Sequence, residues 1–461
     1  MNTILMSSVA ARFENVVGAS HVRTDRADLS NYEIDGVAPA IALQPATAEE
    51  AAHIVRIAVE QKCTVIPCGA RTSLALGLTP ERYDVALDMT RVAGIVHYDP
   101  GDLTISVNAG TRLTALASVL AEKHQFLPLE VPFFQRATVG GVIASGLDSP
   151  LRHFYGTARD FVIGAEFVDG TGALAKSGGR VVKNVTGYDF HKLMNGSLGS
   201  LAVITRVNFR TFPLPALRRG FLASFVDQDG ALGFVGEVAA SALTPAVSDI
   251  ISPEFASFFL AKRLSPGSAV FDKQTWTVCI GFEGSNEMCT RYERELKALA
   301  RAALARDAMI VNDIEFRELL DVLREAPALM SKKGTTQSVV VRCVTLPSNM
   351  RELLRVLRNR ASSSQVSTAV LIRSASVVYV ALSSREEDAT GLKQIASVCN
   401  EVGNLRAEME LSAAILFCPR EWKPELCTFG QTADSLDIAR RVKKAFDPDG
   451  TFASGRFVGG I

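Results

Sequence analysis

Histidine is scarce in this chain and absent from its second half. The six histidines are His21, His53, His97, His124, His153 and His191. Imidazole is the side chain that most often serves as a base or a metal ligand near neutral pH. Any chemistry carried by residues after His191 must therefore use other groups.

The eight cysteines are scattered and include no C-x-x-C pair. Cys63 and Cys68 are five residues apart and Cys418 and Cys427 nine apart, which fits neither a zinc cage nor an iron–sulfur motif. The first residues are a poor signal peptide, because no basic stretch precedes the apolar one and Arg12 interrupts it. We expect reduced thiols, no metal site and a cytoplasmic location, peripheral to the inner membrane only through partners.

The chain also lacks a charge surplus and a long apolar run. It has 461 residues with 49 Lys+Arg against 49 Asp+Glu, which argues against a general nucleic-acid binder. No apolar run approaches the roughly 20 residues of a membrane-spanning helix. Apolar residues make up 48% and charged residues 21%, as in ordered globular proteins, and the length suits two or three domains.

The order of predicted helices and strands indicates an α+β fold. Thr47 and Glu50 form a capping-box pattern before an amphipathic helix, and a buried strand follows at 63–68. Thr111 is predicted to cap another helix, and FPLP at 212–215 is a plausible boundary. The second half alternates helices with strands, and we expect the helices to cover one face of the sheet. Its predicted helices are 288–306, 311–327 and 348–363, and its predicted strands 275–284, 337–346 and 368–384.

Three stretches carry almost no side-chain bulk and could approach a phosphate closely. The first, VIPCGARTSLALG at 65–77, offers backbone N–H groups to an anion but fits a surface turn equally well. The second, RATVGGVIASGLDSP at 136–150, contains Gly140–Gly141. Because each glycine costs about 1 kcal/mol inside a helix, we favour close approach to a ligand over helix packing there. The third is the turn at 196–200.

A competing motif is the GTGALA run at 170–175, which has the glycine spacing of a dinucleotide fingerprint. That fingerprint requires a helix to begin at the glycines, whereas KSGGR follows here and would end one at once. We interpret Gly170 and Gly172 as a hairpin turn.

Taken in order, these motifs resemble a known family. The GARTSLALG loop, ATVGGVIASG and the run through KNVTGYDFHKLMNGSLGSLAVIT resemble the PCMH-type FAD-binding domain of the vanillyl-alcohol oxidase superfamily. The branch most similar holds FAD-linked D-lactate dehydrogenases and glycolate oxidase subunits, above all the smaller flavin-binding subunit of bacterial glycolate oxidase. FDPDGTFASGRF at 446–457 resembles the closing signature of that branch. The middle of the chain, about 216–436, matches no motif.

The resemblance implies a two-lobed FAD-binding domain at 36–215, an α+β cap or substrate domain at 216–436 and a C-terminal segment at 437–461 that returns to the FAD domain. It places the pyrophosphate loop on Pro67, Cys68, Gly69, Ala70, Arg71, Thr72, Ser73 and Gly77. It places a second flavin-contacting segment on Thr138, Gly140, Gly141, Ser145 and Gly146, and the strand near the adenine on Val203 and Ile204. Ala70–Arg71 departs from the family's usual glycine-rich loop, and we favour a solvated Arg71 over one paired with a phosphate.

The resemblance also implies an oxidoreductase, and the departures from the family limit what this chain can do. No histidine lies between His53 and His97, and Cys68 is at the phosphate end, so we expect noncovalent FAD. Related lactate- and hydroxyglutarate-type enzymes use cap histidines that bind a divalent metal. This chain has no histidine after His191, so no catalytic base is assigned. Arg342, Arg373 and Tyr379 could hold a carboxylate, although we favour solvated strand edges.

We therefore expect a glycolate oxidase-like flavoprotein subunit that oxidises a small 2-hydroxy acid and passes electrons to a second flavoprotein and an iron–sulfur subunit. A self-sufficient 2-hydroxy-acid dehydrogenase and a largely non-catalytic assembly subunit with a flavin fold remain the alternatives.

Overall fold

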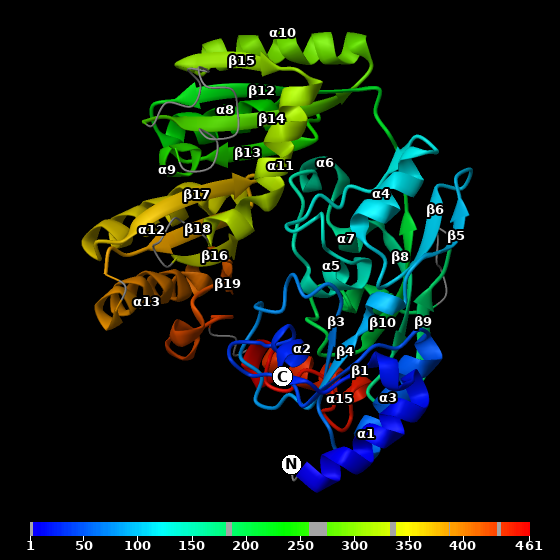
Figure 1. The fold of residues 1–461 in the computed structure, drawn as a ribbon. Coiled ribbons are helices and arrows are strands. Elements are labelled where there is room, and N and C mark those ends of the chain that lie inside the picture. Colours follow the sequence, from blue (N-terminus) through cyan, green and yellow to red (C-terminus); the bar gives the residue numbers. More distant parts are fainter. Residues whose placement is uncertain (1–2, 181–186, 258–273, 332–337, 387, 431–434) are drawn as a thin grey trace.

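The computed structural model describes residues 3–180, 187–257, 274–331, 338–386, 388–430 and 435–461, and Figure 1 shows their arrangement. The described strands form a four-stranded sheet, a five-stranded sheet, a two-stranded ribbon and an eight-stranded sheet. Helices pack on these sheets, so the α+β fold class predicted from the sequence is confirmed. We call residues up to 213 the N-terminal region, and residues 217–426, which contain the eight-stranded sheet, the cap.

The four-stranded sheet has the order β1-β2-β4-β3, and β2, β4 and β3 run parallel. Its strands are β1 (Val22–Arg23), β2 (Ile41–Leu43), β3 (Val65–Cys68) and β4 (Val85–Asp88). The apolar stripe of α3 (Ala48–Glu60) packs on this sheet together with α1 (Thr3–Val17). The hydroxyl of Thr47 accepts the Glu50 N–H at 3.1 Å, as predicted, whereas the Glu50 carboxylate reaches the Ala46 N–H at 2.7 Å, one residue earlier than in a capping box.

The five-stranded sheet is antiparallel, in the order β5-β6-β10-β8-β9. Its strands are β5 (Ile95–Asp99), β6 (Thr104–Asn108), β8 (Val162–Val168), β9 (Leu174–Gly178) and β10 (Val203–Arg210). Strands β8 and β9 form a hairpin whose turn includes Gly172 at φ +79°, which confirms the turn and rules out a dinucleotide fingerprint there.

Helices α4 (Leu113–Ala121) and α5 (Val139–Ser145) pack against the core of the five-stranded sheet. The predicted Thr111 cap of α4 is wrong. Arg112 occupies the cap position, and the Thr111 hydroxyl instead accepts the Gly94 N–H at 2.8 Å. The hydroxyl is thus used to fix the approach to β5 rather than to begin the helix.

The cap sheet has the order β15-β12-β14-β13-β17-β18-β16-β19, with every neighbouring pair antiparallel. Its strands are β12 (Leu217–Phe225), β13 (Val247–Ile251), β14 (Trp276–Gly284), β15 (Asp307–Val311), β16 (Ser338–Val344), β17 (Ser367–Arg373), β18 (Val377–Ser383) and β19 (Ser412–Phe417). Strands β17 and β18 form a hairpin in the stretch that was predicted as strand at 368–384.

Helices cover both faces of the cap sheet, so the expectation of one covered face is wrong. Helices α8 (Gln228–Ala240), α10 (Asn286–Ala302), α12 (Met350–Ser363) and α13 (Ala389–Asn404) share one apolar core with one face. Helix α11 (Asp313–Met330) and the short α9 (Pro253–Phe255) pack on the other face, in a core that also takes in Leu151 of the N-terminal region. Figure 1 shows α11 between the sheet and α6 (Arg152–Tyr155). The apolar stripe of α11 is broad because it faces two regions at once.

The C-terminal segment lies against the N-terminal region (Figure 1). Phe452 forms a parallel bridge with Val65 of β3, and the Lys443 ammonium donates to the Ser200 carbonyl at 2.7 Å. Lys443 belongs to α15 (Leu436–Phe446), which carries the segment back across the molecule. Among the described residues, no helix is both long enough and apolar enough to cross a membrane.

Candidate functional site

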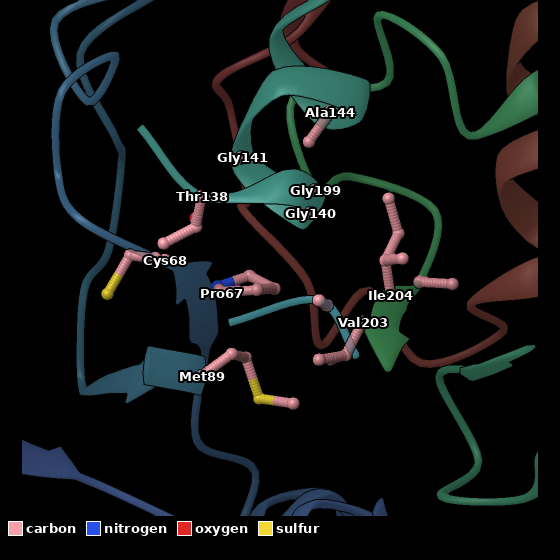
Figure 2. A pocket seen from close by; sticks show the side chains of 13 residues that line it. Pro67, Cys68, Met89, Thr138, Gly140, Gly141, Ala144, Gly199, Val203 and Ile204 are labelled. Carbon is pink, nitrogen blue, oxygen red and sulfur yellow. The ribbon is translucent and has the colours of Figure 1, made fainter. Parts of the chain in front are cut away.

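Three adjoining cavities begin inside the N-terminal region and extend to its boundary with the C-terminal segment and the cap. The first lies between β3, α5 and β10, and Figure 2 shows Pro67, Met89 and Val203 around it. The second shares Pro67 to Gly69 with the first and continues along the loop after β3. The third, the most spacious of the three, shares Ser145 and Leu198 with the second and opens between the N-terminal region and the cap. Together they form one elongated space.

All fifteen residues proposed from the sequence to bind the cofactor line this space. The first cavity has Pro67, Cys68, Gly69, Thr138, Gly140, Gly141, Val203 and Ile204 in its wall. The second adds Ala70, Arg71, Thr72, Ser73 and Ser145, and the third adds Gly77 and Gly146. Three segments far apart in the sequence thus meet along one path, although their contact with a cofactor stays a proposal.

Several further residues of the wall were not proposed from the sequence. They are Met89, Ala109, Ala144, Asn195, Gly196, Leu198, Gly199, Ala202 and Arg456. The turn at 196–200 did carry a signal, because its small residues open directly onto β10. Met89 and Ala109 carried none, since each directly follows an ordinary buried strand.

The wall offers polar groups and space to an elongated ligand. The Thr138 hydroxyl is buried, lines the first cavity and has no hydrogen-bond partner in the described chain. Asn195 lines the third cavity, and its buried side-chain oxygen likewise has no hydrogen-bond partner among the described residues. A Cβ on residue 69 would lie 2.0 Å from the Thr138 hydroxyl oxygen, so glycine is required where the loop after β3 meets the start of helix α5. A narrow space with unused polar atoms and few side chains fits a bound dinucleotide.

The glycine pair has a different cause from the one predicted. Gly140 and Gly141 lie inside helix α5, and a Cβ on Gly140 would lie 2.8 Å from the Ala109 Cβ. Close packing of the helix on the end of β6 therefore explains Gly140, contrary to our expectation. A Cβ on Gly141 would meet only the Thr138 hydroxyl, at 3.2 Å. Gly141 is thus the member of the pair whose added bulk would enter the space and not the protein core.

Arg71 is neither free in solvent, as favoured from the sequence, nor free to bind a phosphate with its whole guanidinium. It donates to the buried Asp88 carboxylate at 3.0 Å, and its guanidinium carbon lies 4.7 Å from the Tyr32 ring centroid. Its backbone has φ +62°, a left-handed conformation in which the family's usual glycine would be unstrained. The ion pair and the ring contact stabilise this conformation in place of glycine.

Cys68 lines the first and second cavities as a neutral thiol. It is buried, and burial together with the nearby Asp88 raises the pKa of its thiol well above the ordinary value. A protonated thiol is a poor nucleophile. This environment supports the expectation that Cys68 does not tether a cofactor.

A buried cluster of charges lies where the cap meets the third cavity, centred on Asp148. Its carboxylate accepts hydrogen bonds from the Tyr379 hydroxyl, from Arg152 and, at 3.3 Å, from Arg373. A guanidinium nitrogen of Arg342 lies 3.7 Å from the same carboxylate. Arg373 and Tyr379 are 0% exposed, so the solvated strand edges favoured from the sequence are wrong for both.

The cluster carries a surplus of positive charge. Asp249 pairs with Arg373 at 3.2 Å, so the two carboxylates of Asp148 and Asp249 face three guanidinium groups, those of Arg152, Arg342 and Arg373. Arg342 alone of the three lines the third cavity, with its side chain 29% exposed. The surplus is therefore presented to the cavity, where an anion would balance it.

Among the described residues, the wall of the third cavity contains no side chain suited to act as a base. Burial alone would raise the pKa of Asp148, but Arg373, Arg342, Arg152 and the Tyr379 hydroxyl outweigh burial and hold it below the ordinary value. A carboxylate of low pKa that is fully engaged in hydrogen bonds is a weak proton acceptor at neutral pH. Asp148 and Arg342 are the charged residues in this part of the described wall, which contains no histidine, lysine or glutamate.

Comparison with known protein families finds two matches along the chain. Residues 39–178 match the FAD binding domain model, and residues 214–377 match the model of the C-terminal domain of FAD linked oxidases. The first match covers the loop at 69–77 and the segment at 138–146. The second covers the cap sheet from β12 through β17.

The chain is similar to several curated proteins. It is 38% identical to glycolate oxidase subunit GlcE of Escherichia coli over 164 residues, which are 35% of this chain and 46% of that protein. It is 25% identical to an FAD-linked oxidoreductase of Mycobacterium tuberculosis over 98% of this chain and 99% of that protein. It is 32% identical to D-2-hydroxyglutarate dehydrogenase of Xanthomonas citri over 44% of each chain. The alignment thus spans less than half of two of these three relatives.

Solved structures share the fold over nearly the whole chain. A 4-ethylphenol oxidase from Gulosibacter chungangensis superposes with a TM-score of 0.76 at 14% identity, covering 99% of this chain and 97% of its own. An alkyldihydroxyacetonephosphate synthase superposes with a TM-score of 0.72 at 16% identity, covering 98% and 86%. At these identities the likeness concerns the fold alone.

Proposed function

Because this chain belongs to the FAD-dependent oxidoreductases of the PCMH-type, vanillyl-alcohol oxidase superfamily, we propose that it serves as a flavoprotein subunit of a glycolate oxidase-like complex. In this proposal a small 2-hydroxy acid is oxidised and the electrons leave to a partner. The partners are a second flavoprotein and an iron–sulfur subunit. The similarity to the E. coli subunit supports this role for the part of the chain that aligns.

The fifteen residues along the elongated space are proposed to hold FAD without a covalent bond. The loop at 69–77 would bind the pyrophosphate, and Val203 and Ile204 would lie near the adenine. The flavin end would then reach the third cavity, beside Gly77 and Gly146. Bound there, FAD would accept the hydride or its equivalent from the substrate carbon.

The observation that carries the proposed role is the composition of the third cavity wall. Arg342 brings a guanidinium whose Nε is buried without a hydrogen-bond partner in the described chain, and this group suits the carboxylate of a hydroxy acid. Among the described residues, the same wall holds no group suited to take the proton of the substrate hydroxyl. An acid-binding site without a base supports a subunit that depends on a partner for robust turnover.

The test is the reaction of the purified chain with glycolate and D-lactate, alone and with the candidate partner subunits. We expect slow anaerobic reduction of the flavin in the isolated chain and fast reduction in the assembled complex. Steady-state turnover is measured with an artificial electron acceptor after treatment with a chelator. A turnover above about 10 per second from the isolated chain, near the median for enzymes, would replace this proposal with a self-sufficient dehydrogenase.

A second result would overturn the proposal in the other direction. If the flavin of this chain is never reduced during turnover of the complex, the chain is an assembly subunit with a flavin fold. Rapid-scan absorption spectra of a complex that carries flavin only in this subunit distinguish that case.

A further inference from the structure

The cap places one buried cation inside the N-terminal region. Lys423 lies in the 3-10 helix η7 (Arg420–Glu425), which follows β19, and it is 6% exposed. Its ammonium lies 2.6 Å from the Asp35 carboxylate and 2.7 Å from the Ala75 carbonyl oxygen. The Thr79 hydroxyl donates to the same Asp35 oxygen at 3.1 Å. A buried ammonium is costly unless it is paired and hydrogen-bonded, and both partners of this one belong to the N-terminal region.

Ala75 belongs to the loop proposed to hold the pyrophosphate, and the carbonyls beside it are bound in the same way. The buried Arg456 of the C-terminal segment donates to the Leu74 carbonyl at 2.6 Å and also to the Leu76 carbonyl. Three consecutive carbonyl oxygens are therefore directed at two buried cations. A carbonyl that faced a diphosphate would repel it, so turning these dipoles toward cations favours an anion-binding loop.

We propose that Lys423 is a positioning residue for FAD. It links the packing of the cap on the N-terminal region to the conformation of the pyrophosphate loop. The proposal rests on the cofactor site described above but not on the substrate or the partners. Arg456 reaches the loop from the chain terminus, whereas Lys423 reaches it from the cap. Displacement of η7 would release the Ala75 carbonyl and weaken FAD binding, although no atom of Lys423 is proposed to touch FAD.

Helix η7 also supplies a matched control. Arg420 forms an ion pair with Glu33 of the N-terminal region at 3.6 Å, but the two side chains are 60% and 40% exposed. Neither residue lines the cavities. Exposed pairs of this kind contribute little to stability. Lys423→Met and Arg420→Met thus each remove one cation that spans the same boundary, and only the first removes a bond to the loop.

The experiment is FAD titration of apoprotein, followed by flavin fluorescence, with thermal unfolding of the same apoproteins. We expect Lys423→Met to raise the Kd for FAD at least 10-fold and Arg420→Met to change it less than 2-fold. An unchanged Kd in Lys423→Met would overturn the proposal. Wild-type apoprotein that binds no FAD would overturn both this proposal and the proposed function, whereas failure to oxidise hydroxy acids leaves this one standing.

A double variant separates positioning from stability. Lys423→Met leaves Asp35 buried without its cation, which by itself destabilises the fold. Asp35→Asn combined with Lys423→Met removes both charges, so we expect the unfolding temperature to recover toward that of the wild type. Because the Ala75 carbonyl still lacks its donor, the Kd should stay at least 10-fold above wild type. A Kd that recovers together with the unfolding temperature would show that Lys423 is only structural and overturn the proposal.

Discussion

The two walls of the third cavity are built on opposite plans. The wall from the N-terminal region is formed mainly by backbone and small side chains such as Gly77, Ser145 and Gly146, with the buried Asp148 beside them. The wall from the cap presents Arg342, which belongs to a buried cluster of three guanidinium groups and two carboxylates that also takes in Asp148 and Arg152 of the N-terminal region. One wall leaves room, and the other supplies charge.

Under the proposed function, the difference matches what each wall would bind. A dinucleotide is long and rich in hydrogen-bonding groups, so backbone dipoles and space suffice to bind it along several segments. A small acid offers one carboxylate and few other contacts, so a preoriented guanidinium must contribute most of its binding. In the proposed function, the cluster around Asp148 would hold Arg342 in place to bind that carboxylate. Four experiments test this contrast between the two walls.

The first concerns the absence of a covalent link on the backbone wall. We expect all the FAD to appear in the supernatant when the yellow protein is precipitated with acid, because Cys68 is a buried, protonated thiol. The measurement is the flavin absorbance of supernatant and pellet. Flavin that stays with the polypeptide would identify a tether and contradict this reading of the wall.

The second tests whether space is what the backbone wall supplies. Gly141→Val should raise the Kd for FAD roughly 100-fold, equivalent to about 3 kcal/mol of steric cost, while the apoprotein still folds. Gly140→Val should also lower the unfolding temperature, because its side chain would meet Ala109 at the end of β6. Gly236→Val is the matched control, since Gly236 is a helix glycine with nothing within 4 Å of an added Cβ. Unchanged FAD affinity in Gly141→Val would show that the site is misplaced.

The third removes the charge that the cap wall presents. Arg342→Met should weaken the binding of glycolate or D-lactate to the holoprotein by about 10- to 100-fold, the loss expected for hydrogen bonds to a charged group. FAD affinity should stay within about 2-fold, and Arg342→Lys should keep part of the binding. Perturbation of the flavin spectrum by the acid gives the Kd. Arg351→Met serves as control because Arg351 is exposed on α12. Equal loss in both variants would contradict a specific role for Arg342.

The fourth concerns the proton balance of the buried cluster. Burial raises the pKa of Asp249 from 3.8 to about 6, despite the opposing effect of Arg373. Between these values the folded chain keeps a proton that the unfolded chain releases, so this group makes stability fall as the pH rises through that window. Asp249→Asn lacks this titrating carboxyl group, so its stability does not carry this pH dependence. We expect the stability of the wild type relative to the variant to fall between about pH 4 and pH 6, as measured by urea unfolding. A constant difference would contradict the raised pKa.

Two features of the N-terminal region follow from local sequence. Small residues after a buried strand predict a loop at 69–77, and the local glycine pattern predicts the hairpin at Gly172. The α+β class follows in the same way, from periodicity within single segments. These features depend on neighbours within a few residues along the chain, so they can be read without the fold.

The charged cluster around Asp148 and the contact of Lys423 with the loop at 69–77 depend on tertiary structure. Asp148 meets Tyr379 across 231 positions, and Lys423 meets Asp35 across 388. The packing of the cap sheet on the N-terminal region sets the first pairing, and the return of the chain after β19 sets the second. Nothing in the sequence near Arg373 distinguishes a buried arginine from one at a solvated strand edge. Its burial depends on partners that only the folded sheet brings within hydrogen-bonding distance, because the cost of desolvating a charge is met by neighbours in space and not in sequence.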